Sequence, residues 1–249
     1  MEGDEQLAHR DIVILANSRR HGAHCIAGKD LATGEWIRPI TIFGKGRDDP
    51  DAFSDDDLRK ITGDSSGPKL LDCVRIGFGS TCGMNCQPEN CFIEGDSWKK
   101  ISQYPRDQVS NLVDTSGYCF LGKNDQYNDR IPISDVKSTP LDCSLNLIKL
   151  NREKNHVSLT HTQKPDGTYK HKMSFTYDSK IYRISVTDSY YEKVYQATKI
   201  EDSILFDDFF MTIGVGADEF TPEHSTIPYH FRLIVGIIPS EDIKEYPQR

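Results

Sequence analysis

Short apolar runs of strand length recur along the whole chain, separated by polar turns that contain glycine, proline or aspartate. The first run, residues 11–16, is β-branched and has the length of a buried strand. Similar or alternating runs predict further strands at 24–28, 35–42, 70–78, 144–150, 156–162, 169–177, 181–187, 209–215 and 230–238. Helical patterns are confined to 55–61, about 98–113 with a break at Pro105, and 190–198.

The turns between these strands have recognisable chemistry. Thr33-Gly34, Pro165-Asp166-Gly167 and Asp178-Ser179 each join two runs closely enough to form a hairpin. Each half of the chain therefore offers about five or six short strands and at most one or two helices. Small closed barrels bury such strands without leaving free edges. We expect a mainly β chain of two tandem barrels, over residues 1–138 and 139–249, joined by a connector at 132–141.

Composition narrows the class of protein. The chain has 249 residues, is 37% hydrophobic and carries a formal net charge of −8. The charge argues against a protein that coats nucleic acid non-specifically, yet leaves room for a small basic site. Seven cysteines without a pairing pattern favour reduced thiols. No apolar run approaches the ~20 residues of a membrane span, and the first residues lack a signal-peptide pattern. We expect a cytoplasmic protein with no membrane contact.

Three groups of segments carry a resemblance to a known family. They are Ile14–Arg20 with Cys25–Gly28 and Gly34–Pro39; Leu71–Val74 with Gln87–Asn90; and Tyr182–Asp188 with Tyr229–Ile238. Together they resemble the dual OB-containing domain family of prokaryotic proteins. The resemblance implies two tandem OB-like barrels and an association with conflict, or anti-phage, systems. Where the family has Gly-Arg before the Cys-Ile-Ala-Gly segment, this chain has Ala23-His24.

Basic, hydroxyl and aromatic residues gather in the first predicted barrel. Ser18, Arg19 and Arg20 follow the first strand beside a glycine, where a ligand can approach the backbone. Arginine's planar fork suits phosphate, and a serine hydroxyl can hold a phosphate oxygen. Trp36 and Arg38 are two residues apart on one strand and so share a face. If that face is exposed, they form a site for single-stranded nucleic acid or a nucleotide; otherwise Trp36 is a core residue and Arg38 ties down a loop.

Cysteine chemistry gives a weaker alternative. Cys82, Cys86 and Cys91 have the spacing C-x₃-C-x₄-C, which is not the paired C-x₂-C pattern of a structural zinc site. We expect free thiols and no metal or other cofactor, with zinc on these three cysteines as the alternative.

Catalysis is not expected, because no set of residues forms a motif of fixed geometry. The candidates that can be assembled are Cys25 with His21 and His24, and Asp188 with His230. His24 and Cys25 are strand neighbours and would face apart. Asp188 can instead cap the helix predicted at 190–198.

Two functions follow from these features. The first is a binding module for single-stranded nucleic acid or a nucleotide, acting as accessory or sensor in a prokaryotic defence or nucleic-acid-processing system with a protein partner from that system. The alternative is a protein–protein adaptor without a nucleic-acid role. It would dock its partner through the barrel faces and the acidic loop Asp48–Asp57, which holds six aspartates and no base.

Overall fold

The structure is a computed structural model that describes residues 8–20, 22–41, 52–62, 67–81, 86–94, 98–117, 129–198, 207–223 and 225–241. The chain divides into two compact units. The first comprises Met1–Met84 and Pro88–Pro105, and the second comprises Asn85–Gln87 and Arg106–Arg249. The domain boundary expected near residue 138 lies inside the second unit. That the chain folds as two independent domains divided at this residue stays a prediction.

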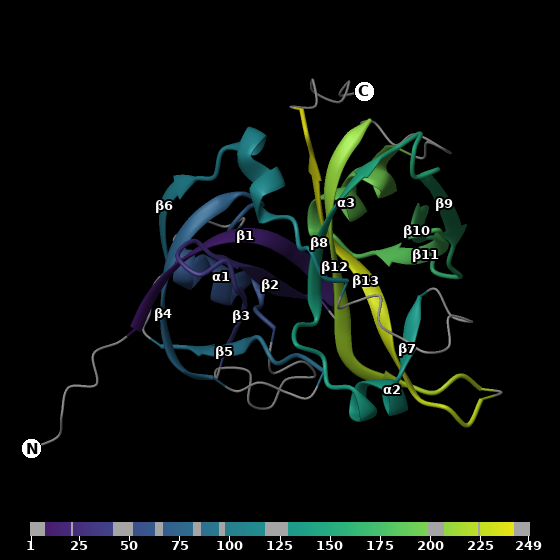
Figure 1. Cartoon of the computed structure of the whole chain (residues 1–249), viewed down its shortest axis with the longest axis horizontal. Coiled ribbons are helices and arrows are strands. Elements are labelled where there is room, and N and C mark those ends of the chain that lie inside the picture. The colour runs from purple at the N-terminus through teal and green to yellow at the C-terminus, as the bar shows by residue number, and fades with distance from the viewer. Residues whose placement is uncertain are drawn as a thin grey trace, which may run out of the picture. The chain divides into compact units, whose positions relative to one another are not determined.

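Over its described residues, the first unit is a closed β barrel with one helix (Figure 1). Its elements are β1 (Ala8–Arg20), β2 (Ala23–Asp30), β3 (Trp36–Ile40), α1 (Asp55–Thr62), β4 (Asp72–Thr81), β5 (Asn90–Ile93) and β6 (Lys99–Gln103). The strands follow the order β1-β2-β3-β5-β4-β6, and an additional pairing of β1 with β4 closes the ring. The helix lies between the third and fourth strands of the ring in sequence.

Strand β1 is long enough to serve two neighbours. Its first half pairs with β4 from Ala8 to Val13, and its second half pairs with β2 from Ile12 onwards. Strands β3 and β5 are parallel, whereas the other pairs are antiparallel. Apolar side chains fill the barrel interior: Ile12, Ile14, Ile26, Ile37, Phe53, Leu58, Val74, Ile76, Phe78, Cys91, Ile93 and Trp98.

The second unit holds a larger sheet and two α-helices. Its strands are β7 (Arg130–Pro132), β8 (Leu145–Asn151), β9 (Ser158–Gln163), β10 (Tyr169–Tyr177), β11 (Lys180–Val186), β12 (Asp208–Phe220) and β13 (Tyr229–Pro239). A 3-10 helix covers Arg106–Leu112, and α2 (Ile133–Ser138) and α3 (Ser189–Thr198) are α-helical. No helix within the described ranges is long and apolar enough to cross a membrane.

The second sheet repeats the strand order of the first barrel. It runs β9-β10-β11-β13-β12-β8, with β7 added to β13. Again the third and fifth strands, β11 and β13, are parallel. Strands β8 and β9 share the role of β1: β8 pairs with β12 and β9 pairs with β10. A continuous apolar core that includes Met173, Phe175 and Phe209 lies inside this sheet.

Each of the two longer helices begins at a side-chain cap. At α1 the Ser54 hydroxyl donates to Asp57 Oδ2 over 2.7 Å, and the Asp57 backbone N–H donates back to the Ser54 hydroxyl over 3.1 Å. At α3 the carboxylate of Asp188 accepts the N–H groups of Tyr190 and Tyr191, both at 2.9 Å. The capping role expected for Asp188 is confirmed.

The mainly β class, the helices at 55–61 and 190–198, and the three hairpin turns are confirmed. The helix expected around 98–113 is wrong in its first half, where Lys99–Gln103 form β6 beside β4. Every residue of β6 is exposed, so the period-2 burial pattern that identifies a strand is missing there.

Candidate functional site

The residues that the sequence placed at the first-barrel site are mostly buried. Trp36 and Arg38 share the side of β3 opposite the core residue Ile37, but Trp36 is only 8% exposed. The ammonium of Lys29 lies 5.3 Å from the centre of the Trp36 indole. The two side chains therefore share a face, as their spacing predicted, but that face is not exposed as the nucleic-acid site required.

Arg38 forms an ion pair with Glu89, the residue that directly precedes β5. Its Nη2 lies 3.1 Å from Glu89 Oε1 and its Nε lies 3.2 Å from the same oxygen. The side chains of Arg38 and Glu89 are 12% and 3% exposed. A guanidinium in a buried ion pair is costly to detach, so Arg38 holds the turn before β5, in agreement with the alternative that it ties down a loop.

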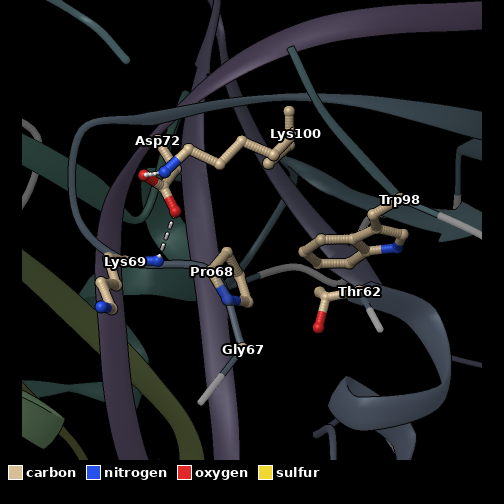
Figure 2. Close-up of a pocket in the computed structure, with 8 residues that line it drawn as sticks. Thr62, Gly67, Pro68, Lys69, Asp72, Trp98 and Lys100 are labelled. Carbon is tan, nitrogen blue, oxygen red and sulfur yellow. Dashed lines mark hydrogen bonds and ion pairs between the residues drawn. The ribbon is translucent and has the colours of Figure 1, made fainter. Parts of the chain in front are cut away.

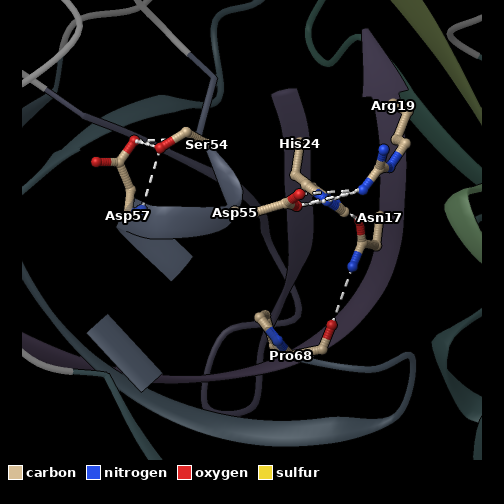
Figure 3. A network of polar contacts seen from close by, with 7 residues as sticks. All are labelled: Asn17, Arg19, His24, Ser54, Asp55, Asp57 and Pro68. Atoms are coloured by element: carbon tan, nitrogen blue, oxygen red, sulfur yellow. Dashed lines mark hydrogen bonds and ion pairs between the residues drawn. The ribbon is translucent and has the colours of Figure 1, made fainter. Parts of the chain in front are cut away.

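Ser18, Arg19 and Arg20 are the last residues of β1, and this end of the strand takes part in a polar network (Figure 3). Ser18 is buried, and Arg19 Nη2 lies 3.2 Å from Asp55 Oδ1. The backbone of Arg20 pairs with Ala23, while the side chain of Arg20 lies outside the described part of the chain. Arg19 is thus the one member of this segment whose side chain both keeps some exposure and has described partners.

His24 connects the network. Its Nδ1 lies 2.8 Å from Asn17 Oδ1, and its Nε2 lies 2.9 Å from Asp55 Oδ1. Asn17 Nδ2 donates to the carbonyl oxygen of Pro68 over 3.0 Å, which assigns Oδ1 to the histidine side. Nε2 of His24 also lies 3.4 Å from Arg19 Nη2, so this nitrogen is in contact with both members of the Arg19–Asp55 ion pair. The network ties β1, β2, the start of α1 and residue 68 together.

The cysteine alternative does not gather its ligands in the described structure. Cys82 lies outside the described residues. Cys86 packs in the core of the second unit, and Cys91 packs in the core of the first. Burial raises the pKa of the Cys91 thiol, which disfavours the thiolate that a metal would need. Among the residues that the structure positions, no three His, Cys, Asp or Glu side chains are grouped to hold a metal ion.

The candidate catalytic residues have structural contacts. His21 lies outside the described residues, and Cys25 is half-buried beside the His24 network. Asp188 Oδ2 also accepts the N–H of Ile237 over 2.9 Å, which links α3 to β13. Nδ1 of His230 lies 3.3 Å from the carbonyl oxygen of Asp218.

A basic face that the sequence did not reveal lies on the second unit. Side chains alternate across β9, β10 and β11, so that, away from the strand ends, the inward positions are apolar or histidine, and the outward positions other than Ile181 are polar. The outward set, called here the β9–β11 face, is Ser158, Thr160, Thr162, Lys170, Lys172, Ser174, Thr176, Ile181, Arg183 and Ser185. It combines cations with hydroxyls, and none of its members is a carboxylate.

Register brings the cations of the β9–β11 face close together. Lys172 is paired with Thr160 on one side and Ser185 on the other, and Ser174 is paired with Arg183. Nη2 of Arg183 donates to the Thr160 hydroxyl over 3.2 Å, across the width of β10. The rows of hydroxyls and cations therefore form one continuous surface rather than separate groups.

Positive charges are crowded on the β9–β11 face. Partial burial lowers the pKa of Lys170, and the neighbouring Lys172 and Lys164 lower it further, while Asp129 opposes them. Asp129 is also an ion-pair partner of Lys172, with 3.2 Å between Oδ2 and Nζ. An anion bound here would relieve the repulsion between the lysines.

A histidine pair lies on the inner side of the same strands. His161 and His171 are directly opposite in the register, with 2.8 Å between their Nδ1 atoms. Burial, followed by the nearby His161 and Lys164, lowers the pKa of His171 to about 4. At neutral pH His171 is therefore uncharged.

These observations define the class of protein. Each unit has the strand order 1-2-3-5-4 with a parallel third and fifth strand and a helix between the third and fourth, which is the OB fold used to bind oligonucleotides and oligosaccharides. The family model for the dual OB-containing domain matches residues 10–237, and the chain belongs to this family. No curated protein and no solved structure matched the chain.

Proposed function

We propose that the chain binds the sugar–phosphate backbone of single-stranded nucleic acid on the β9–β11 face. The single observation that carries the proposal is the cluster of Lys170, Lys172 and Arg183 among hydroxyls on the outer side of these strands. Strands β10 and β11 correspond to the second and third strands of an OB barrel, the strands on which such barrels hold oligonucleotides.

The make-up of the face favours recognition of backbone over bases. Lysine and arginine neutralise phosphates, and serine and threonine hydroxyls donate to phosphate oxygens. None of the face's outward positions is aromatic, so base stacking has no platform on it. Ile181 is 65% exposed and offers an apolar contact at one end. The proposed binding is therefore tolerant of sequence and sensitive to salt.

The first-barrel residues have a different part in this proposal. Trp36 and Arg38 maintain the barrel, and Arg19 remains a candidate for contact with a ligand. No catalysis and no cofactor are part of the proposal, because side chains of the chain itself are sufficient for phosphate binding. An accessory role in a prokaryotic defence system, with a protein partner, is supported only by the resemblance to the family.

The first test measures oligonucleotide binding by fluorescence anisotropy over a range of salt concentrations. The variant Lys170→Gln/Lys172→Gln/Arg183→Gln should bind single-stranded oligonucleotides at least about tenfold more weakly than the unmodified chain. Its plot of log K against log salt should be shallower by about 2, because each lost single-strand phosphate contact removes about 0.7 from the slope.

The matched control removes the same charge elsewhere. Lys60, Lys137 and Lys193 are exposed on α1, α2 and α3, and their triple replacement by Gln should leave binding nearly unchanged. Equal losses in the two triple variants would mean that net charge, and not the β9–β11 face, controls binding.

The adaptor alternative keeps one observation in its favour, the net charge of −8. It predicts no oligonucleotide binding at any salt concentration and a single stoichiometric protein partner in a pull-down. The anisotropy experiment therefore separates the two functions directly.

A further inference from the structure

A pocket in the first unit has no part in the proposed nucleic-acid site. It has a volume of about 240 Å³ and is bordered by the segment that enters β4 and by the beginning of β6. Figure 2 shows the ring of Pro68 and the indole of Trp98 on facing sides, with Lys69, Asp72 and Lys100 along one edge. We call it the Trp98 pocket.

Two apolar rings give this pocket walls suited to a flat group. Trp98 is only 5% exposed, and Phe53 packs edge-on against its indole at 5.3 Å between ring centres. The contact with Phe53 and the burial of Trp98 both restrict rotation of the indole. A planar aromatic ring that slides between Trp98 and Pro68 would stack on a surface already in place.

The edge of the pocket is positively charged. Asp72 is buried, and its Oδ1 lies 2.6 Å from Lys100 Nζ, while its Oδ2 accepts the backbone N–H of Lys69 over 3.0 Å. The carboxylate therefore faces one ammonium, that of Lys100, and one backbone N–H, while the exposed side chain of Lys69 adds a second cation to the lining of the pocket. The remaining positive charge favours an anionic group at this edge.

The wall formed by Pro68 is also fixed. Its carbonyl oxygen accepts from Asn17 Nδ2, and Asn17 is in turn bound to His24 and through it to Asp55 (Figure 3). The polar network of the first barrel thus holds one side of the pocket, as Phe53 holds the other. A site whose walls are held in place before binding loses little entropy when it is filled.

We propose that the Trp98 pocket binds a single nucleoside monophosphate, with its base between Pro68 and Trp98 and its phosphate between Lys69 and Lys100. The volume of about 240 Å³ is below the range of about 300–1,000 Å³ typical of drug-sized ligands, which favours a single nucleotide over an oligonucleotide. The pocket belongs to the first unit and the β9–β11 face to the second, so either proposal can fail without the other.

The test uses adenosine 5′-monophosphate and isothermal titration calorimetry on the unmodified chain. Adenosine, which lacks the phosphate, and ribose 5-phosphate, which lacks the base, should each bind at least about tenfold more weakly, because each loses one half of the contacts. Ribose 5-phosphate binding as tightly as the nucleotide would overturn the proposal, since stacking would then contribute nothing. Absence of heat and of binding in equilibrium dialysis would overturn it as well.

Variants locate the bound nucleotide. Lys69→Gln/Lys100→Gln should weaken binding of the nucleotide at least about tenfold. Lys99→Gln is the matched control, because Lys99 is exposed and adjacent on β6 yet does not line the pocket. A similar loss in both variants would place the nucleotide elsewhere.

Fluorescence gives a second reading that is specific to the pocket. The chain has two tryptophans, Trp36 and Trp98. In Trp36→Phe the nucleotide should quench the remaining emission, and in Trp98→Phe it should not. Quenching in Trp98→Phe but not in Trp36→Phe would contradict the assignment. If Trp36→Phe does not fold, the calorimetric comparison of the lysine variants decides the question alone.

Discussion

At Gly28 the backbone of β1 leaves no room for a side chain on β2. A methyl group built on its Cα would meet the carbonyl oxygen of Val13 at 2.1 Å, and that oxygen belongs to the backbone and cannot move aside. The Cys-Ile-Ala-Gly segment of the family resemblance thus ends in a residue that the barrel requires to be glycine.

We expect Gly28→Ala to lower the free energy of unfolding by about 3 kcal/mol or more, at the upper end of overpacking effects. Gly34→Ala is the comparison, because Gly34 has a φ of +74° but nothing within 4 Å of an added Cβ. Its cost should be about 1 kcal/mol, the strain of a left-handed residue alone. Urea unfolding of both variants measures the difference; equal costs would mean that β1 can shift to accommodate the methyl group.

At the scale of single residues, the sequence predicts which side chains share a face but not which partners they meet after folding. The pattern placed Trp36 and Arg38 on one face, which follows from the two-residue spacing. It could not supply Glu89, which is 51 positions away from Arg38 and engages it only after folding. Lys170, Lys172 and Arg183 were present in strands that the pattern had found, and their common face could have been read from alternation within each strand. Their register across three strands could not.

At the scale of elements, Asp188 joins a helix to a strand. Its Oδ1 accepts the N–H groups at the start of α3, and its Oδ2 accepts the N–H of Ile237 in β13. Asp188→Asn keeps one oxygen but turns an amide donor towards one of these N–H groups. We expect a loss of about 1–3 kcal/mol in the free energy of unfolding, the cost of a buried unsatisfied donor.

The same residue gives a pH dependence. Burial raises the pKa of Asp188 to about 7 from 3.8, although the three N–H groups act against this. A raised pKa means that the folded state holds the proton more tightly than the unfolded state, so this contribution to stability is complete below about pH 4 and disappears as the pH rises through about 7. Denaturant midpoints between these values should fall with pH more steeply in the unmodified chain than in Asp188→Asn. Parallel curves would exclude the linkage.

Elements were predictable where burial alternates and unpredictable where it does not. Strands β8 to β13 coincide with apolar or alternating runs, and their turns contain residues with positive φ, such as Asp178, Ser179 and Gly167. Strand β6 is exposed throughout, so its sequence carries no alternating pattern, and a helix was expected there. It is a strand because it pairs with β4. The shared role of β8 and β9 as one divided strand is a property of pairing that no single run contains.

At the scale of the whole molecule, an acidic chain carries a basic face. The formal net charge is −8, so a nucleic acid that approaches from a distance meets repulsion, while one in contact with the β9–β11 face meets cations. Repulsion over long distances is screened by salt beyond a Debye length of about 8 Å at physiological ionic strength. Added salt should therefore ease the approach of the two molecules, by screening their repulsion, and weaken the bound complex, by screening its ionic contacts.

This contrast gives a kinetic prediction for the proposed binding, one that differs from the behaviour of basic nucleic-acid-binding proteins. In those proteins attraction accelerates association, and the association rate constant falls steeply as salt is added. Here the association rate constant should change by less than about tenfold between low and physiological salt, and the dissociation rate constant should carry most of the salt dependence, because contacts at Lys170, Lys172 and Arg183 exist only in the complex. Stopped-flow anisotropy measures both constants. A steep fall in the association rate constant would mean that the local field of the face dominates at a distance, and that the −8 charge lies where the nucleic acid does not encounter it.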